Sequence, residues 1–478
     1  MKKRIFALVL AVAMIATVLT GCGGTSETEY VKDDLSKEAH LVWVLAMEEP
    51  AAYPEVIEEV NKYLKEKINA TLEIQFIQPA DYATKVNMML ASQESDWDLM
   101  FTSNWQNPYE NNVLLGGYYD LKEMLEKETP ELYKFFPDSY WEALTLNGGI
   151  YAVPMNQVMY QQKGMWFKKE TAEKYDLVEK IENMANYEDM EEIYTTVHEN
   201  EPEMIVAGGF QYDLFEEVGT TVKGGFTIEN GEVTDGLDED KLNQYKLARE
   251  WYTKGFFPQE VKFEEAPFLK MGKIFSRYNR QLPGADAKHR ISYDWDVINK
   301  ATNGMILRRE DVQGALTAIN RMSKNPARAL KLLELMTTDQ YLFNLMAYGI
   351  EGVHYTKDGN RITPTENSYY VQEFRIGNQF LAYLMPGYEE GVWEETDKLN
   401  REAKVDENMG FVFDVTPVET EITNLNSATE YSDSLGKGTA EDVEGTFQKH
   451  LEKRKAAGDQ KVKEEIEMQY AAWKATQE

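Results

Sequence analysis

The residue types that most often carry catalysis are few and widely separated in this chain of 478 residues. Its histidines are His40, His198, His289, His354 and His450. They do not form the His-x-x-x-His spacing that places two zinc ligands on one helix face, and no Gly-x-Ser-x-Gly segment marks a nucleophilic serine. A pair of carboxylates for glycoside hydrolysis is available among the 82 Asp and Glu residues. We therefore expect no catalytic residue, no metal ion and no cofactor, with a glycosidase as an alternative.

The only cysteine, Cys22, has the clearest chemistry in the sequence. It follows a basic start and the apolar run 5–19, which is the pattern of a secretory signal. A bilayer span needs about 20 apolar residues, so this run is too short to cross a membrane. The segment Leu19-Thr20-Gly21-Cys22 resembles the lipobox of bacterial lipoproteins. That resemblance implies that residues 1–21 are removed and that Cys22 becomes an acylated N-terminus; the alternative is a free thiol behind a cleaved signal.

The acidic balance of the chain limits the kinds of partner. The formal net charge is −32, from 50 Lys and Arg against 82 Asp and Glu. A field of this sign repels nucleic acid and anionic membrane surfaces. We therefore expect no nucleic-acid partner, and contact with the membrane only through the lipid on Cys22. The hydrophobic share of 43% is enough to build cores. A single cysteine cannot form a disulfide within the chain, so packing alone must stabilise these cores.

The first third of the chain has the pattern of an α/β sheet. The apolar run 40–46 is typical of a strand buried on both faces. Residues 71–77 alternate like a strand, and 98–102 form a third candidate. Helical periodicity over 53–68 and 81–92 separates these strands. This order predicts a parallel sheet with right-handed crossovers.

The other segments predict a tether, a second α/β region and a helical end. Residues 22–37 are polar, without an apolar period, and predict a flexible tether. A strand at 149–154 leaves the first sheet, and a second α/β region runs from about 155 to 300. Apolar character returns near 314–319, and the pattern is mostly helical from 366 onward.

Several motifs, taken in order, resemble one family. They are residues 65–72, 98–102, 147–154, 323–329, 349–355, 377–380 and 410–414. With the lipobox, they are similar to bacterial lipoprotein extracellular solute-binding proteins (family 1) of ABC importers, in the subfamily with an uncharacterised C-terminal domain. The resemblance covers nearly all of residues 38–476.

This resemblance implies a type II periplasmic-binding-protein fold, with two α/β lobes around a hinged cleft and a helical C-terminal region. The first lobe is expected at 38–153 plus about 305–350. The second is expected at 154–304 plus about 361–478, including the helical domain from about 366. Chain crossings are expected near 153–154, near 298–299 and between 350 and 361. The family also implies a small-molecule solute, ABC permease subunits as partners, and a lipid-anchored location on the extracellular face of the cell membrane.

Polar and aromatic residues follow two of the predicted strands. Ligands of open α/β sheets lie beyond the carboxyl ends of the strands. Met47 and Glu48 follow the first strand, and Asn104 and Trp105 follow the third. Glu48 would accept hydrogen bonds from hydroxyl groups, and the Trp105 ring would stack on a sugar. The alternatives are an exposed acid at a helix start and an aromatic ring folded back onto the core.

Three further candidates lie later in the chain. By strand alternation Met165 and Phe167 share one face, and the family resemblance favours the Phe167 face for the ligand. Trp295 lies where the chain is expected to return between the lobes. Asn378 lies in a predicted helix that is otherwise apolar on one side, so an amide that only packs helices is the alternative.

The resulting prediction is a lipid-anchored extracellular solute-binding protein that passes a neutral solute to an ABC permease and breaks no bond. The family resemblance and an aromatic share of 12% favour an oligosaccharide. The alternatives are a peptide-binding lipoprotein, a surface glycosidase, and a sensor subunit that reports its ligand to a membrane kinase.

Overall fold

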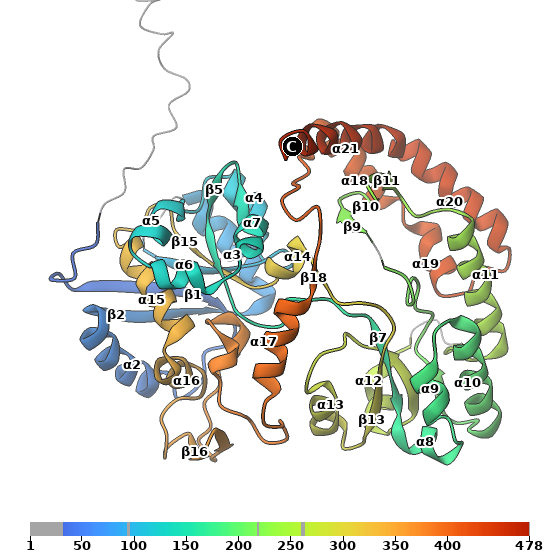
Figure 1. Ribbon diagram of the computed structural model, residues 1–478, viewed down its shortest axis with the longest axis horizontal. Helices are drawn as coiled ribbons and strands as arrows, with labels where there is room; N and C mark the ends of the chain where they lie inside the picture. Colours follow the sequence, from blue (N-terminus) through green and yellow to red (C-terminus); the bar gives the residue numbers. More distant parts are fainter. Residues whose placement is uncertain (1–31, 93–95, 218, 260–262, 478) are drawn as a thin grey trace, which may run out of the picture.

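The computed structural model describes residues 32–92, 96–217, 219–259 and 263–477. Cys22 and the predicted signal lie outside these residues. Two lobes are joined by extended segments (Figure 1), one containing β1 (Ala39–Ala46) and the other containing β7 (Gly164–Lys168). Within the described part of the chain, no helix has the length and apolarity needed to cross a bilayer.

The first lobe is built on a five-stranded sheet in the order β2-β1-β3-β15-β6. Its other strands are β2 (Ala70–Ile77), β3 (Leu99–Thr102), β6 (Ala152–Pro154) and β15 (Leu316–Ile319). β1 pairs in parallel with β2 and β3, with Trp43 opposite both Ile74 and Leu99. β15 lies antiparallel between β3 and β6. The carboxyl ends of β1, β2 and β3 therefore lie along one edge of the sheet.

Amphipathic helices connect and cover these strands, as the periodicity predicts. In α2 (Tyr53–Ile68), residues Val56, Val60 and Leu64 are buried at intervals of four, which places them on one stripe. α3 (Pro79–Ser92) follows β2, so the predicted α/β order is confirmed. The remaining helices around this sheet are α4 (Tyr109–Leu114), α5 (Lys122–Lys127), α6 (Pro130–Phe135), α7 (Asp138–Leu144), α15 (Pro326–Thr338) and α16 (Gln340–Tyr348).

The second lobe contains a four-stranded sheet in the order β13-β7-β12-β8. Its other strands are β8 (Ile205–Ala207), β12 (Ile274–Tyr278) and β13 (Val297–Ala301). β12 is parallel to β8, whereas β7 runs antiparallel to both β12 and β13. Its helices are α8 (Lys169–Lys174), α9 (Val178–Asn183), α10 (Tyr187–Asn200), α11 (Glu239–Lys254), α12 (Glu265–Lys270) and α13 (Ala285–Tyr293).

The C-terminal helices pack partly on a separate small sheet and partly on α11 of the second lobe. That sheet has the order β11-β10-β9 and comprises β9 (Thr220–Val222), β10 (Phe226–Glu229) and β11 (Glu232–Thr234). The helices are α18 (Glu419–Ser427), α19 (Glu430–Gly436), α20 (Val443–Ala457) and α21 (Asp459–Lys474). Phe226 and Ile228 share one core with Ile422 and Ile466. The helices form an outer arc above the second lobe (Figure 1).

Residues 362–409 belong to the first lobe, which corrects the predicted boundary at about 361. Ile362, Val371, Ile376 and Met409 lie in the same hydrophobic core as β1. β16 (Tyr355–Asp358) and β17 (Arg361–Pro364) form a hairpin there, and α17 (Val392–Glu402) follows. The expected crossing between 350 and 361 is therefore wrong, because the apolar faces of this segment are buried against the first lobe.

Three crossing segments lie side by side at the hinge. They are the segment around Gln161, β14 (Ile306–Leu307) and β18 (Lys404–Val405). The backbone N–H of Gln161 donates to Ile306 at 2.7 Å, and Ile306 returns a bond at 2.9 Å. β14 and β18 pair in parallel. The first two crossings lie within about ten residues of the expected positions, and the third follows α17.

The start of the first lobe corrects the predicted tether of residues 22–37. Arg328 in α15 is 2% exposed and binds the two carboxylate oxygens of Asp33 at 2.8 and 3.1 Å. It also donates to the carbonyls of Lys37 and Ile68. Residues 33–37 are therefore held by the fold. The polar composition did not show this, because the partner arginine lies far away in sequence.

Candidate ligand-binding site

Trp105 lies in a short loop after the carboxyl end of β3, where its ring is held and exposed at the same time. Its Nε1 donates to the carbonyl of Gly314 at 2.7 Å. Phe101 contacts it edge-on, with ring centroids 6.2 Å apart. The side chain is nevertheless 58% exposed. A flat aromatic face is thus presented to solvent, and the alternative of a ring folded into the core does not apply.

The loop that carries Trp105 is fixed by its own hydrogen bonds. Thr102 Oγ1 donates to the carbonyl of Asn107 at 2.6 Å, and Ser103 Oγ donates to that of Gln106 at 2.7 Å. Asn107 has a φ of 59°, which asparagine tolerates better than most residues. Asn112 in α4 donates to its side-chain oxygen at 2.5 Å. Small polar residues therefore close a tight loop under the exposed ring.

A buried arginine packs beside the same ring. Arg375 is 5% exposed. Its guanidinium carbon lies 4.6 Å from the Phe101 centroid and 5.6 Å from the Trp105 centroid. Burial lowers the pKa of Arg375. This residue was not among the predicted site residues, because its distance from β3 in sequence hides the contact.

Helix α14 (Arg309–Val312) connects the Trp105 loop to the hinge. Asn104 Nδ2 donates to the carbonyl of Glu310 at 2.7 Å. Asp311 accepts a bond from Gln161 Nε2, in the first crossing segment, at 2.6 Å. Burial raises the pKa of Asp311 to about 6, against the opposing effect of the Gln161 bond. Burial also raises the pKa of Glu310. Two carboxyl groups at this junction are thus sensitive to pH.

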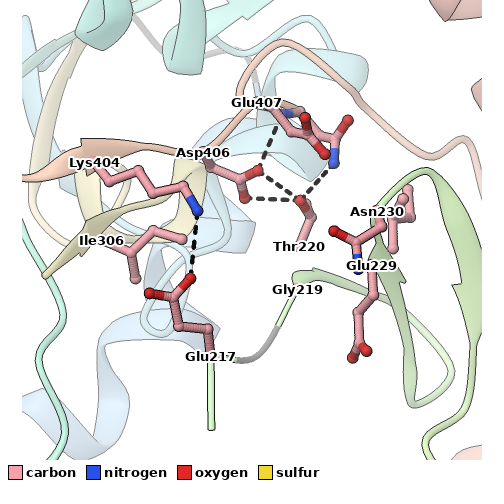
Figure 2. A pocket seen from close by; sticks show the side chains of 11 residues that line it. Glu217, Gly219, Thr220, Glu229, Asn230, Ile306, Lys404, Asp406 and Glu407 are labelled. Carbon is pink, nitrogen blue, oxygen red and sulfur yellow. Dashed lines mark hydrogen bonds and ion pairs between the residues drawn. The ribbon is translucent and has the colours of Figure 1, made fainter. Parts of the chain in front are cut away.

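A polar cavity of about 310 Å³ lies between the hinge and the small sheet (Figure 2). Thr220 Oγ1 lies 2.7 and 2.8 Å from the two carboxylate oxygens of Asp406, and Asn408 Nδ2 donates to Thr220 Oγ1 at 2.9 Å. Lys404 and Glu217 form an ion pair of 3.3 Å across the same space. Hydroxyl, amide and carboxylate groups therefore surround a space next to the third crossing.

The second lobe has a cavity of about 430 Å³ at the carboxyl ends of β8 and β12. It is lined by Met165, Ala207, Gly208, Gly209, Gln211, Phe263, Glu265, Ser276, Arg277 and Tyr278. Arg277 pairs with Glu265 at 2.9 Å, and Tyr278 is 39% exposed. Sequence reasoning missed this site, although the Gly208-Gly209 pair directly after a buried strand was a signal for it.

The structure brings together two of the predicted residues of the first lobe. Asn104 and Trp105 lie in one loop and both bond to the α14 region. Glu48 is exposed after β1, and Met47 is half-buried against the first core. The role of these four residues in binding stays a prediction.

The other three predicted ligand residues, Phe167, Trp295 and Asn378, lie outside the Trp105 loop. Phe167 is 0% exposed, within the core of the second lobe, so it offers no surface to a ligand. Trp295 lies near the start of β13, beside Lys168 at the end of β7 away from the hinge. Its Nε1 donates to Leu269, and it packs on Trp166 at 5.3 Å.

Asn378 is also a structural residue. It caps the short helix η2 (Gln379–Leu381), since its Oδ1 accepts from the Phe380 N–H at 3.1 Å. Its Nδ2 donates to Thr337, and Oδ1 also accepts from Asn156. The side chain is 5% exposed and its polar atoms are engaged within the protein. The packing alternative therefore describes it better than a ligand contact.

The described residues contain no group of three or more His, Cys, Asp or Glu side chains arranged to hold a metal ion. Around the Trp105 ring and the polar cavity lie hydroxyl, amide and carboxylate groups together with two cations, Arg375 and Lys404. Such a set suits a solute with many hydroxyl groups.

Comparison with known proteins links the fold to one class. Residues 407–475 match the family model DUF3502, a domain of unknown function. The chain is 26% identical to a carbohydrate ABC transporter substrate-binding protein of Streptococcus pneumoniae serotype 4, and the match covers 98% of each protein.

Solved structures give the same result for the fold. The N-glycan transport solute binding protein of Streptococcus pneumoniae matches with a TM-score of 0.79 at 24% identity, over 92% of this chain and 100% of that one. Its complexes with Man1GlcNAc and Man5GlcNAc match with TM-scores of 0.69 and 0.67. The resemblance found in the sequence is confirmed: the chain is similar, over nearly its whole length, to the solute-binding proteins of ABC transporters and shares their two-lobed fold.

Proposed function

We propose that this protein is the solute-binding component of an ABC importer and that it holds an oligosaccharide between its two lobes. The observation that carries the proposal is Trp105, a ring fixed by a 2.7 Å hydrogen bond yet 58% exposed, at the carboxyl edge of the first sheet. Aromatic faces bind the apolar faces of sugar rings, while hydroxyl groups use nearby polar side chains. The Streptococcus pneumoniae relatives, one named for carbohydrate and one for N-glycan transport, support a sugar as the solute.

Calorimetry with a panel of sugars tests this function. We expect the mature chain to bind at least one of Man5GlcNAc, Man1GlcNAc and maltose and to leave it chemically unchanged. Binding of peptides in place of all these sugars would favour the peptide-binding alternative. Release of a chromophore from an aryl glycoside would favour the glycosidase, because a binding protein produces none.

The proposal extends to an acylated Cys22, which would keep the protein beside the permease on the outer face of the membrane. Cys22→Ser should release the protein into the medium or leave the signal uncleaved, because stable anchoring requires acyl chains. Cell fractionation measures this. Processed Cys22→Ser protein that still sediments with membranes would contradict the anchor.

A further inference from the structure

Arg375 is a buried cation whose known partners are neutral. Its Nε donates to Gln372 Oε1 at 2.5 Å, and Nη1 donates to Gln106 Oε1 at 3.3 Å. No carboxylate in the described part of the chain lies within ion-pair distance of it. Burying an arginine without a counter-ion is unfavourable, so a compensating interaction is expected.

The compensating interaction comes from aromatic rings. The guanidinium carbon lies 4.6 Å from the centroid of Phe101, 4.8 Å from that of Phe374 and 5.6 Å from that of Trp105. All three distances are within the roughly 6 Å over which a cation is attracted to a ring face. A planar guanidinium also stacks on rings in a way that an ammonium cannot. Arg375 therefore links residues 362–409 of the first lobe to the exposed ring of Trp105.

We propose that Arg375 is a positioning residue that holds the Trp105 ring in the orientation in which it receives the solute, an inference that rests on the proposed function. The hydrogen bond from Nε1 fixes one point of the ring, and Phe101 supports one edge. Arg375 limits the remaining rotation. A ring ordered in advance avoids the entropy that is otherwise lost when the solute binds.

A double-mutant cycle tests this role, with Man5GlcNAc as the probe and the mature chain as the protein. Arg375→Met should weaken binding roughly fivefold, the effect of leaving one large side chain to be ordered on binding. In a Trp105→Ala background the same change should have no effect, because the ring on which Arg375 acts is absent. Arg375→Lys should recover part of the affinity. Arg401→Met, which removes an exposed arginine from α17, is the matched control and should leave affinity unchanged.

Affinity measured on folded protein separates positioning from a general structural role. Arg375→Met also loses the contacts with Phe101 and Phe374, so affinity is measured well below the unfolding transition of each variant. Unchanged affinity of folded Arg375→Met protein would overturn the proposal. An equal loss of affinity with and without the Trp105 ring would also overturn it, since Arg375 would then act independently of that ring.

One measurement needs no ligand and therefore separates this inference from the proposed function. The indole N–H signal of Trp105 is identified in an NMR spectrum as the one lost in Trp105→Phe. Arg375→Met should broaden that signal or speed its hydrogen exchange, and Arg401→Met should not. If the signal is unaffected, Arg375 does not hold the ring. If Trp105→Ala leaves Man5GlcNAc affinity unchanged while Arg375→Met alters the indole signal, then Trp105 does not bind the sugar, but Arg375 still holds the ring.

Discussion

At the scale of single residues, exposure and restraint occur together at Trp105. Large exposed side chains are usually free to rotate, and ordering them on binding costs free energy. Here the backbone of Gly314, the edge of Phe101 and the Arg375 guanidinium each restrict the ring. A solute that stacks on it therefore meets a surface already in place.

Trp105→Ala should weaken binding of the sugar that the calorimetric panel identifies by about 1–3 kcal/mol, the value of burying one large side chain. The free energy of unfolding should change by less than about 1 kcal/mol, because most of the ring is exposed. Calorimetry and urea denaturation measure the two quantities. A large loss of stability with unchanged affinity would show that the ring serves the fold.

Phe167→Ala should give the opposite pattern. Its ring is fully buried and packs on Phe275 with centroids 5.5 Å apart, so the substitution should destabilise the protein by about 3–5 kcal/mol. Affinity measured well below the unfolding transition should be unchanged. Weaker binding by fully folded Phe167→Ala protein would restore the original prediction that this face touches the ligand.

The sequence identified the Trp105 loop because two local signals coincide there, a buried strand and a polar segment after it. The strand face of Phe167 was ambiguous, because all of β7 except its last residue is buried and alternation then carries no information. Asn378 and Trp295 were misplaced for another reason. The Asn378 amide N–H donates to Thr337, 41 residues away, and the Trp295 indole N–H donates to Leu269, 26 residues away, so no local pattern shows that these donors are already bonded.

At the scale of elements, α14 joins the Trp105 loop to the hinge, and its carboxyl groups respond to pH. Asp311 is 7% exposed, accepts from Gln161 at 2.6 Å, and has a pKa raised to about 6 from an ordinary value of 3.8. A raised carboxyl pKa means that the folded state prefers the protonated form. The stability contributed by that form is complete below about pH 4 and is lost as the pH rises through about 6.

Asp311→Asn should remove this dependence. Relative to the variant, the native protein should lose up to about 3 kcal/mol of unfolding free energy between about pH 4 and 7, the value of about two pKa units. Urea denaturation at several pH values gives the difference. A constant difference between the two proteins over this range would show that Asp311 has the same pKa in the folded and unfolded states.

The strands and helices of the first sheet were predictable because each has a strong period and lies between neighbours in sequence. The small sheet β9–β11 was not predicted, since its strands have three or four residues and gain their core from helices more than 180 residues later. Hydrophobic periodicity also could not show which lobe buries residues 362–409, because it identifies an apolar face but not the element that packs on that face.

At the scale of the whole molecule, three paired crossing segments allow the lobes to rotate while each core stays intact. A solute that touches both lobes binds the closed arrangement more tightly and shifts the population toward it.

We expect the protein to become more compact when its sugar is added. Small-angle scattering of a chain that begins at Lys32 should show a lower radius of gyration, while Trp105→Ala at the same sugar concentration should show a smaller change. An unchanged profile at a sugar concentration that calorimetry shows to be saturating would contradict closure of the lobes.

The position of β15 has a consequence for the order in which the lobes form. β15 lies between β3 and β6, yet it follows the second lobe in the chain. Until it has emerged, β3 and β6 each keep an unpaired edge, the kind of surface from which strands aggregate. At a synthesis rate of about 5–20 residues per second, the residues between β6 and β15 delay the appearance of β15 by roughly ten to thirty seconds. The four strands β7, β8, β12 and β13 lie within residues 164–301, so the sheet of the second lobe is complete before the sheet of the first lobe can close.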